Sequence, residues 1–104
     1  MSPIARRISA ACLFGLLGSC VANVPVPRPE DARGDETVLR QLQEGRRLYL
    51  GKCSSCHGLS DVDRFSDREW NEHVGEMLAL RKVRLNEEEY AALARYLTTM
   101  NGRE

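Results

Sequence analysis

The chain has 104 residues, with 15 Lys+Arg balanced by 15 Asp+Glu, four cysteines and 42% apolar residues. This length suits one small domain and not two. A net charge of zero provides no basic face for nucleic acid, and no apolar stretch reaches the roughly 18 residues of a lasting transmembrane helix. The composition therefore indicates a single small soluble domain.

Residues 1–19 have the layout of a secretory signal, because Arg6 and Arg7 precede an apolar run over residues 8–17. The run ends in Leu17-Gly18-Ser19-Cys20, which resembles the lipobox of bacterial lipoproteins. The resemblance implies cleavage after Ser19, lipidation of Cys20, and a domain anchored to a membrane of the bacterial cell envelope, facing the periplasm. The alternatives are an ordinary cleavable signal, which leaves a soluble periplasmic protein, or an uncleaved N-terminal anchor. Cleavage removes two arginines and no acidic residue, so the mature net charge becomes −2.

Residues 20–36 contain every proline of the mature chain, Pro25, Pro27 and Pro29. Alternating prolines favour an extended polyproline conformation, which rises about 3.1 Å per residue and would reach roughly 50 Å. We therefore expect a lipid anchor followed by a stiff Pro-rich tether. The alternative is a plain disordered linker.

From residue 37 to residue 104 the hydrophobic pattern is helical, with no proline and no alternating β-branched run. Three helices are expected, over about 35–50, 66–81 and 86–101. Asp35 is the expected N-cap of the first, Ser66 opens a capping box with Glu69 in the second, and Asn86 precedes three acidic residues in the third. The predicted fold class is all-α. The inward positions are Val38, Leu42, Gly45, Tyr49, Trp70, Val74, Met77, Leu78, Tyr90, Leu93, Ala94 and Leu97.

The first two expected helices are separated by the motif Cys53-Ser54-Ser55-Cys56-His57. Two thiols at this spacing can each add to a vinyl group of haem, and the following histidine is placed to bind the iron as its proximal ligand. A thioredoxin-type pair would need a βαβ setting, and a zinc site would need a fourth ligand, for which Cys20 and His73 are the other mature candidates. A disulfide closing this small loop or a chance occurrence are the remaining alternatives. Cys12 leaves with the signal, so no cysteine is left to pair.

Residues 37–103 resemble a class I-type cytochrome c domain. The resemblance rests on Gly45-Arg46-Arg47-Leu48-Tyr49, on Cys53-Ser54-Ser55-Cys56-His57-Gly58, and on Tyr96-Leu97 near the end of the last helix. It implies three main helices around one covalently bound haem c, with thioethers to Cys53 and Cys56 and with His57 on the iron. It also implies that Gly45 and Tyr49 of the first helix pack against Tyr96 of the last, because Gly lets the two helices cross closely.

The segment from Trp70 through Val74 to Met77 resembles a compact subgroup in which a Trp-x-x-x-Val-x-x-Met helix follows the haem motif. That resemblance implies Met77 as the distal iron ligand, although a methionine on an apolar helix face can also be a core residue. Met100, His73 and an open or water-bound iron are the alternatives. Unlike the longer class I proteins, this chain has no Pro/Gly-rich methionine loop.

With histidine and methionine ligands, a haem exchanges an electron without exchanging atoms. We therefore expect an electron-transfer protein and not an enzyme, with redox proteins of the envelope as partners. The alternatives are a haem-based sensor or ligand-binding module, and a haem subunit of a larger dehydrogenase. Arg81, Lys82 and Arg84 are expected either near the haem propionates or simply solvated. A domain of this size rarely supplies more than about 3–5 kcal/mol of stability, so we expect the apoprotein to be largely unfolded or molten.

Overall fold

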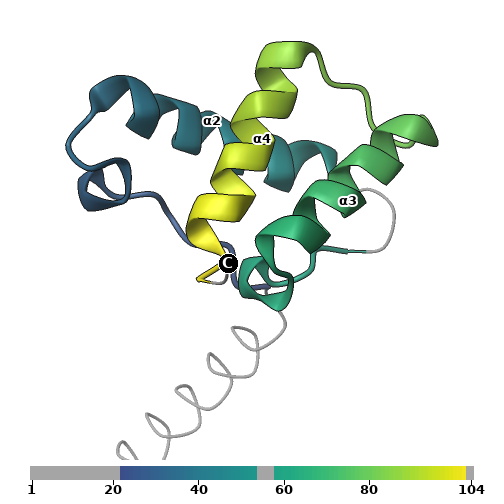
Figure 1. Cartoon of the computed structure of the whole chain (residues 1–104), viewed down its shortest axis with the longest axis horizontal. Coiled ribbons are helices and arrows are strands. Elements are labelled where there is room, and N and C mark those ends of the chain that lie inside the picture. Colours follow the sequence, from purple (N-terminus) through teal and green to yellow (C-terminus); the bar gives the residue numbers. More distant parts are fainter. Residues whose placement is uncertain (1–21, 54–57, 103–104) are drawn as a thin grey trace, which may run out of the picture.

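The computed structural model describes residues 22–53 and 58–102. Within these ranges the protein is all-α, with no strand, as the hydrophobic pattern predicts. Figure 1 shows α2 and α4 crossing, with α3 beside α4 and the C-terminal end near the start of α3. The elements in chain order are η1 (Pro29–Ala32), α2 (Glu36–Lys52), η2 (Val62–Arg64), α3 (Asp67–Ala79) and α4 (Glu87–Met100).

Each α-helix begins at the predicted cap. The Asp35 carboxylate accepts hydrogen bonds from the N–H groups of Thr37 and Val38, at 2.9 and 3.2 Å. Two reciprocal capping boxes open the other helices, formed by Ser66 with Glu69 and by Asn86 with Glu89. These side chains satisfy backbone donors that the first turn of a helix leaves without partners.

The first and last helices cross at Gly45, as the resemblance implies. A Cβ placed on Gly45 would collide with the Ala92 carbonyl oxygen and would lie 2.5 Å from the Cβ of Tyr96. Real Cβ atoms essentially never show such distances, so glycine is the residue that permits this approach. The crossing therefore brings the backbones of α2 and α4 close together and buries Tyr96 completely.

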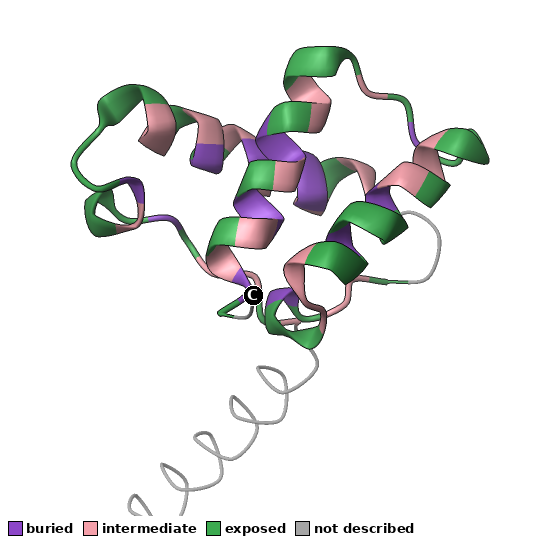
Figure 2. Cartoon of the chain, viewed as in Figure 1, coloured by how far each residue is buried: buried purple, intermediate pink, exposed green. Residues whose placement is uncertain are grey.

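The core lies where α2, α3 and α4 face one another, and Figure 2 shows the buried positions on these inner faces. Its members include five of the residues expected inside, and Val62 of η2 joins them from the loop before α3. None of these helices is both long and apolar enough to span a bilayer across the described ranges. The buried cluster consists of Leu48, Tyr49, Val62, Trp70, Val74, Ala92, Leu93, Tyr96 and Leu97.

Helix α3 ends at Ala79, two residues before the expected end at Arg81. Arg81 has a φ of 57°, in the left-handed region, and a right-handed helix cannot continue through it. Its N–H donates to the Leu78 carbonyl at 3.1 Å, and the N–H of Lys82 donates to the Met77 carbonyl at 3.0 Å. This pair of bonds is a Schellman motif, which satisfies the last carbonyls of the helix.

The described part of the expected Pro-rich tether is packed against the helices and does not extend away from them. Residues 29–32 form the short helix η1, and Ala32 and Pro27 are buried. The Tyr96 hydroxyl donates a hydrogen bond to the Pro25 carbonyl at 2.6 Å, across 71 positions of sequence. The segment packs against the domain instead of extending because its backbone carbonyls remain free to accept hydrogen bonds, and side chains of α2 and α4 donate to them. We call residues 22–35 the N-terminal segment.

Candidate functional site

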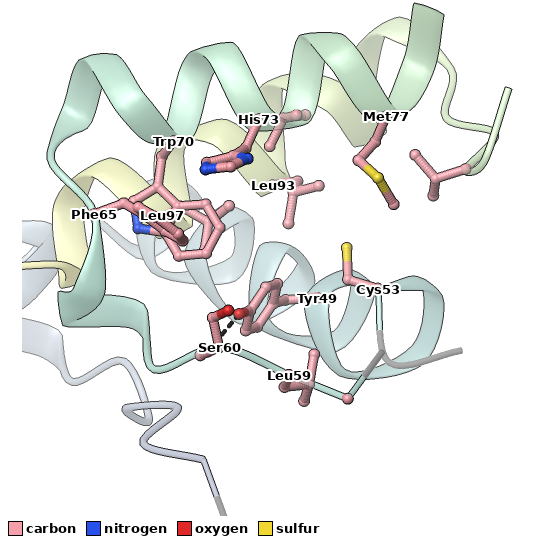
Figure 3. Close-up of a pocket in the computed structure, with 13 residues that line it drawn as sticks. Tyr49, Cys53, Leu59, Ser60, Phe65, Trp70, His73, Met77, Leu93 and Leu97 are labelled. Carbon is pink, nitrogen blue, oxygen red and sulfur yellow. Dashed lines mark hydrogen bonds between the residues drawn. The ribbon is translucent and has the colours of Figure 1, made fainter. Parts of the chain in front are cut away.

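A pocket of about 220 Å³ lies between the end of α2 and the inner face of α3, with α4 behind it. Its lining is predominantly apolar and aromatic. Figure 3 shows the side chains of α3 facing those of α2 across this space. The lining residues are Tyr49, Cys53, Gly58, Leu59, Ser60, Phe65, Trp70, His73, Val74, Met77, Val83, Leu93 and Leu97.

The pocket brings together two sulfur atoms from different elements. Met77 follows Trp70 and Val74 at helical spacing, so all three side chains lie on the inner side of α3. Cys53 caps the C-terminus of α2, where its N–H donates to the Tyr49 carbonyl at 3.2 Å. In Figure 3 the thioether of Met77 and the thiol of Cys53 point toward one another across the pocket.

Only part of the predicted haem motif belongs to the described residues. Ser54, Ser55, Cys56 and His57 lie outside them, as does Cys20. The two residues that flank this gap, Cys53 and Gly58, both line the pocket. Gly58 has a φ of +74°, which other residues adopt only with strain. The described residues on both sides of the gap therefore lie at the wall of the pocket.

Three aromatic rings pack together and form an aromatic wall of the pocket. The rings of Tyr49 and Trp70 meet edge to face at 5.7 Å between centroids, and those of Phe65 and Trp70 at 4.9 Å. Such arrangements are the favoured geometry for aromatic pairs. Phe65 was not among the residues expected inside, because it lies outside the helices and only its position next to the Ser66 cap could have indicated it.

Polar atoms of this wall are hydrogen-bonded to the loop that follows the motif. The indole N–H of Trp70 donates to the Val62 carbonyl at 2.8 Å, and the Tyr49 hydroxyl donates to the Ser60 carbonyl at 2.5 Å. Burial is the main cause that raises the pKa of Tyr49 far above its usual value, so the phenol stays neutral and remains a donor. These bonds connect the loop over residues 58–65 to α2 and α3 and thereby define one side of the pocket.

The residue before Cys53 connects α2 to the chain after α3. The ammonium group of Lys52 donates to the Arg84 carbonyl at 2.7 Å and lies 3.7 Å from the carboxylate of Glu89 at the start of α4. This contact joins the last turn of α2 to the first turn of α4. It positions the end of α2, and with it Cys53, relative to α4.

The other ligand candidates fall on different sides of the molecule. His73 is exposed, but its ring also lines the pocket, and its centroid lies 4.3 Å from that of the Phe65 ring. Met100 packs at the far end of α4, beside Pro25 and Val26 of the N-terminal segment, and does not line this pocket. The structure therefore brings Met77 and His73 to the site and leaves Met100 away from it.

The nearby charged side chains do not enter the pocket. Asp61 and Asp67 accept hydrogen bonds from the Asn23 N–H and from the Asn101 amide, at 2.6 and 2.7 Å. Arg81 and Lys82 are exposed. Among the described residues, no three His, Cys, Asp or Glu side chains are grouped closely enough to bind a metal ion by themselves.

The lining suits an apolar ligand, and the Met77 thioether and the His73 imidazole are the lining groups that can bind a metal. Comparisons of the chain with protein-family models, with curated proteins and with solved structures found no match.

Proposed function

We propose that this protein is a single-haem c-type cytochrome that transfers electrons between redox proteins of the bacterial envelope, to whose membrane it is attached through lipid on Cys20. The observation that carries the proposal is the convergence of Met77 and Cys53 on one apolar pocket whose wall also contains Gly58, the residue directly after the Cys-x-x-Cys-His motif. An unrelated disulfide or redox pair would not require a methionine facing it across an aromatic pocket.

The pocket residues fit a haem in their chemistry. Cys53 and Cys56 would attach it through thioethers, His57 would be the proximal ligand and Met77 the distal ligand. The cavity of about 220 Å³ is smaller than the roughly 300–1,000 Å³ of pockets that enclose a ligand almost completely, so part of the macrocycle would stay exposed. Exposure of one edge is compatible with electron exchange with another protein.

A haem bound here supplies an iron centre that alternates between Fe(III) and Fe(II). The protein would exclude water from the haem and provide the iron ligands. Trp70, Val74 and Leu97 provide apolar walls that are almost completely buried. A thioether from Met77 would raise the reduction potential relative to a second histidine.

The covalent attachment is tested by the alkaline pyridine haemochrome of a Cys53→Ala, Cys56→Ala double variant expressed with haem-maturation machinery. Loss of the signal is expected, and an unchanged signal would overturn the proposal. A redox titration of the wild-type protein should show reversible one-electron behaviour.

The distal ligand is tested with three matched variants, Met77→Ala, Met100→Ala and His73→Ala. Only Met77→Ala should lose the long-wavelength sulfur-to-iron charge-transfer band of the oxidised protein, and its reduced form should bind carbon monoxide. Met100→Ala is the control, because that methionine lies outside the pocket. Carbon monoxide binding by the wild-type protein without loss of fold would instead favour a haem-based sensor.

A further inference from the structure

The N-terminal segment is attached to the rest of the domain from its second described residue onward. The N–H of Asn23 donates to the Asp61 carboxylate at 2.6 Å, and the Val62 N–H donates to the Asn23 carbonyl at 2.9 Å. Both backbone groups of Asn23 are therefore bonded to the loop that contains η2. Asn23 and Asp61 are exposed, but Val62 is completely buried, so one of the two bonds connects the segment to a core residue.

The next two residues of the segment are bonded to the crossing helices. The guanidinium of Arg46 on α2 donates twice to the Val24 carbonyl, at 3.3 Å from both nitrogens. The Tyr96 hydroxyl on α4 donates to the Pro25 carbonyl. Bonds to η2, α2 and α4 in three successive residues attach the chain firmly at residues 23–25.

This attachment leaves a very short connection to the proposed lipid. Cys20 precedes Asn23 by three residues, and a fully extended chain covers at most about 3.6 Å per residue. A lipid on Cys20 would therefore lie within about 11 Å of Asn23. That distance is about the diameter of one helix and far below the roughly 50 Å of an extended polyproline tether.

The attachment point lies at one end of the molecule. Figure 1 shows η2, the start of α3 and the C-terminal end of α4 together at this end, from which α3 runs away. Asn101 joins two of these parts, since its amide donates to the Phe65 carbonyl and to Asp67. Met77 is ten residues along α3 from Asp67, which places it about 15 Å farther along the helix axis.

We infer that the domain sits directly on the lipid surface with the η2 end toward the membrane and the Cys53–Met77 side of the pocket turned away from it. The inference rests on the lipid anchor of the proposed function. In this orientation, the surface that contacts the membrane is the region around Asn23, Asp61 and Asp63. It also presents the haem side to a partner that approaches from the aqueous phase, and not to one embedded in the same bilayer.

The orientation can be measured on the lipidated full chain in phosphatidylcholine vesicles with nickel chelated to some lipid headgroups. Cys20, Cys53 and Cys56 are consumed by lipid and haem, so a single introduced cysteine can carry a nitroxide label. We compare Asp63→Cys, exposed in η2, with Leu80→Cys, which is 56% exposed just beyond α3. Relaxation by the headgroup nickel should be several-fold stronger at position 63. Equal relaxation, or stronger relaxation at position 80, would overturn the inferred orientation.

A length variant tests the role of the short connection without altering the fold. About ten Gly/Ser residues inserted between Val21 and Ala22 give a flexible tether, and the difference between positions 63 and 80 should then largely disappear. An undiminished difference would show that the short connection does not set the orientation.

The outcomes separate this inference from the proposed function. Equal relaxation in membrane-bound, haem-containing protein refutes the orientation alone. Protein that is not retained by vesicles, and behaves like Cys20→Ser, refutes the lipid anchor and the orientation but leaves the haem carrier standing. Protein that orients as expected but lacks covalent haem refutes the electron-transfer proposal alone.

Discussion

Replacing Gly45 by alanine should separate α2 from α4. The added Cβ would stand 2.5 Å from the Cβ of Tyr96 and would collide with the Ala92 carbonyl oxygen. Restoring an ordinary carbon–carbon distance of about 3.5 Å requires the helices to part by about 1 Å, and a gap of that size forfeits a quarter to a half of each facing dispersion contact. Overpacking of this kind costs about 1–3 kcal/mol, whereas Gly→Ala in an open helix position gains about 0.8–1 kcal/mol.

Two other helical glycines supply matched controls for the same substitution. Gly51 on α2 and Gly75 on α3 have nothing within 4 Å of a built Cβ. In thermal and urea unfolding of the haem-containing protein, Gly45→Ala should lower Tm by at least about 4–8 °C, since 1 kcal/mol corresponds to that shift in a domain of this size. Gly51→Ala and Gly75→Ala should raise Tm by a few degrees or leave it unchanged. If Gly45→Ala were as stable as the two controls, the close crossing of α2 and α4 would be refuted.

Three further perturbations test other parts of the structure. Trp70→Phe removes the indole donor from the buried Val62 carbonyl and should cost about 1–3 kcal/mol in urea unfolding; a smaller loss would mean that the bond contributes little. Burial raises the pKa of Tyr96 to about 12, partly opposed by Arg46, so the folded protein keeps the phenolic proton that the unfolded chain releases from about pH 10. The stability contributed by the protonated Tyr96 phenol is therefore present below pH 10 and lost as the pH rises toward 12. A urea midpoint that stays constant between pH 10 and pH 12 would contradict this expectation. Arg81→Gly relieves a left-handed backbone and should stabilise the fold by about 1 kcal/mol, whereas Leu80→Gly, with φ at −84°, should destabilise it; equal effects of the two would argue against the Schellman turn.

The helices could be predicted from the sequence because the signals that start them are local. Asp35, Ser66 and Asn86 each bond to an N–H within three residues, and two of them do so within a capping box that the sequence displays directly. The inward faces follow from the 3.6-residue period alone. The end of α3 was less predictable, since nothing in the residue type of Arg81 announces a left-handed conformation.

The inner face of α3 at the candidate site was predictable from the sequence, but the full lining of the pocket was not. Met77 lines the pocket with Trp70 and Val74, as their spacing on one helix requires. Phe65 and His73 could not be assigned to the pocket lining from sequence, because their contact depends on how the loop over residues 58–65 folds back along α3. That path depends on hydrogen bonds from Trp70 and Tyr49 to backbone carbonyls, which any residue type could provide.

By itself the sequence determined what depends on neighbours within one helical turn: an all-α domain, the helix starts, the face that carries Trp70 and Met77, and the five-residue motif on which the haem proposal depends. Only the tertiary structure decided where distant segments meet. The clearest case is the proline-rich stretch, whose composition indicated an extended tether but whose Pro25 carbonyl accepts a hydrogen bond from Tyr96, 71 residues away. Backbone carbonyls are common to all residues, so sequence cannot specify which donor reaches them, and this contact turns an expected spacer into part of the domain.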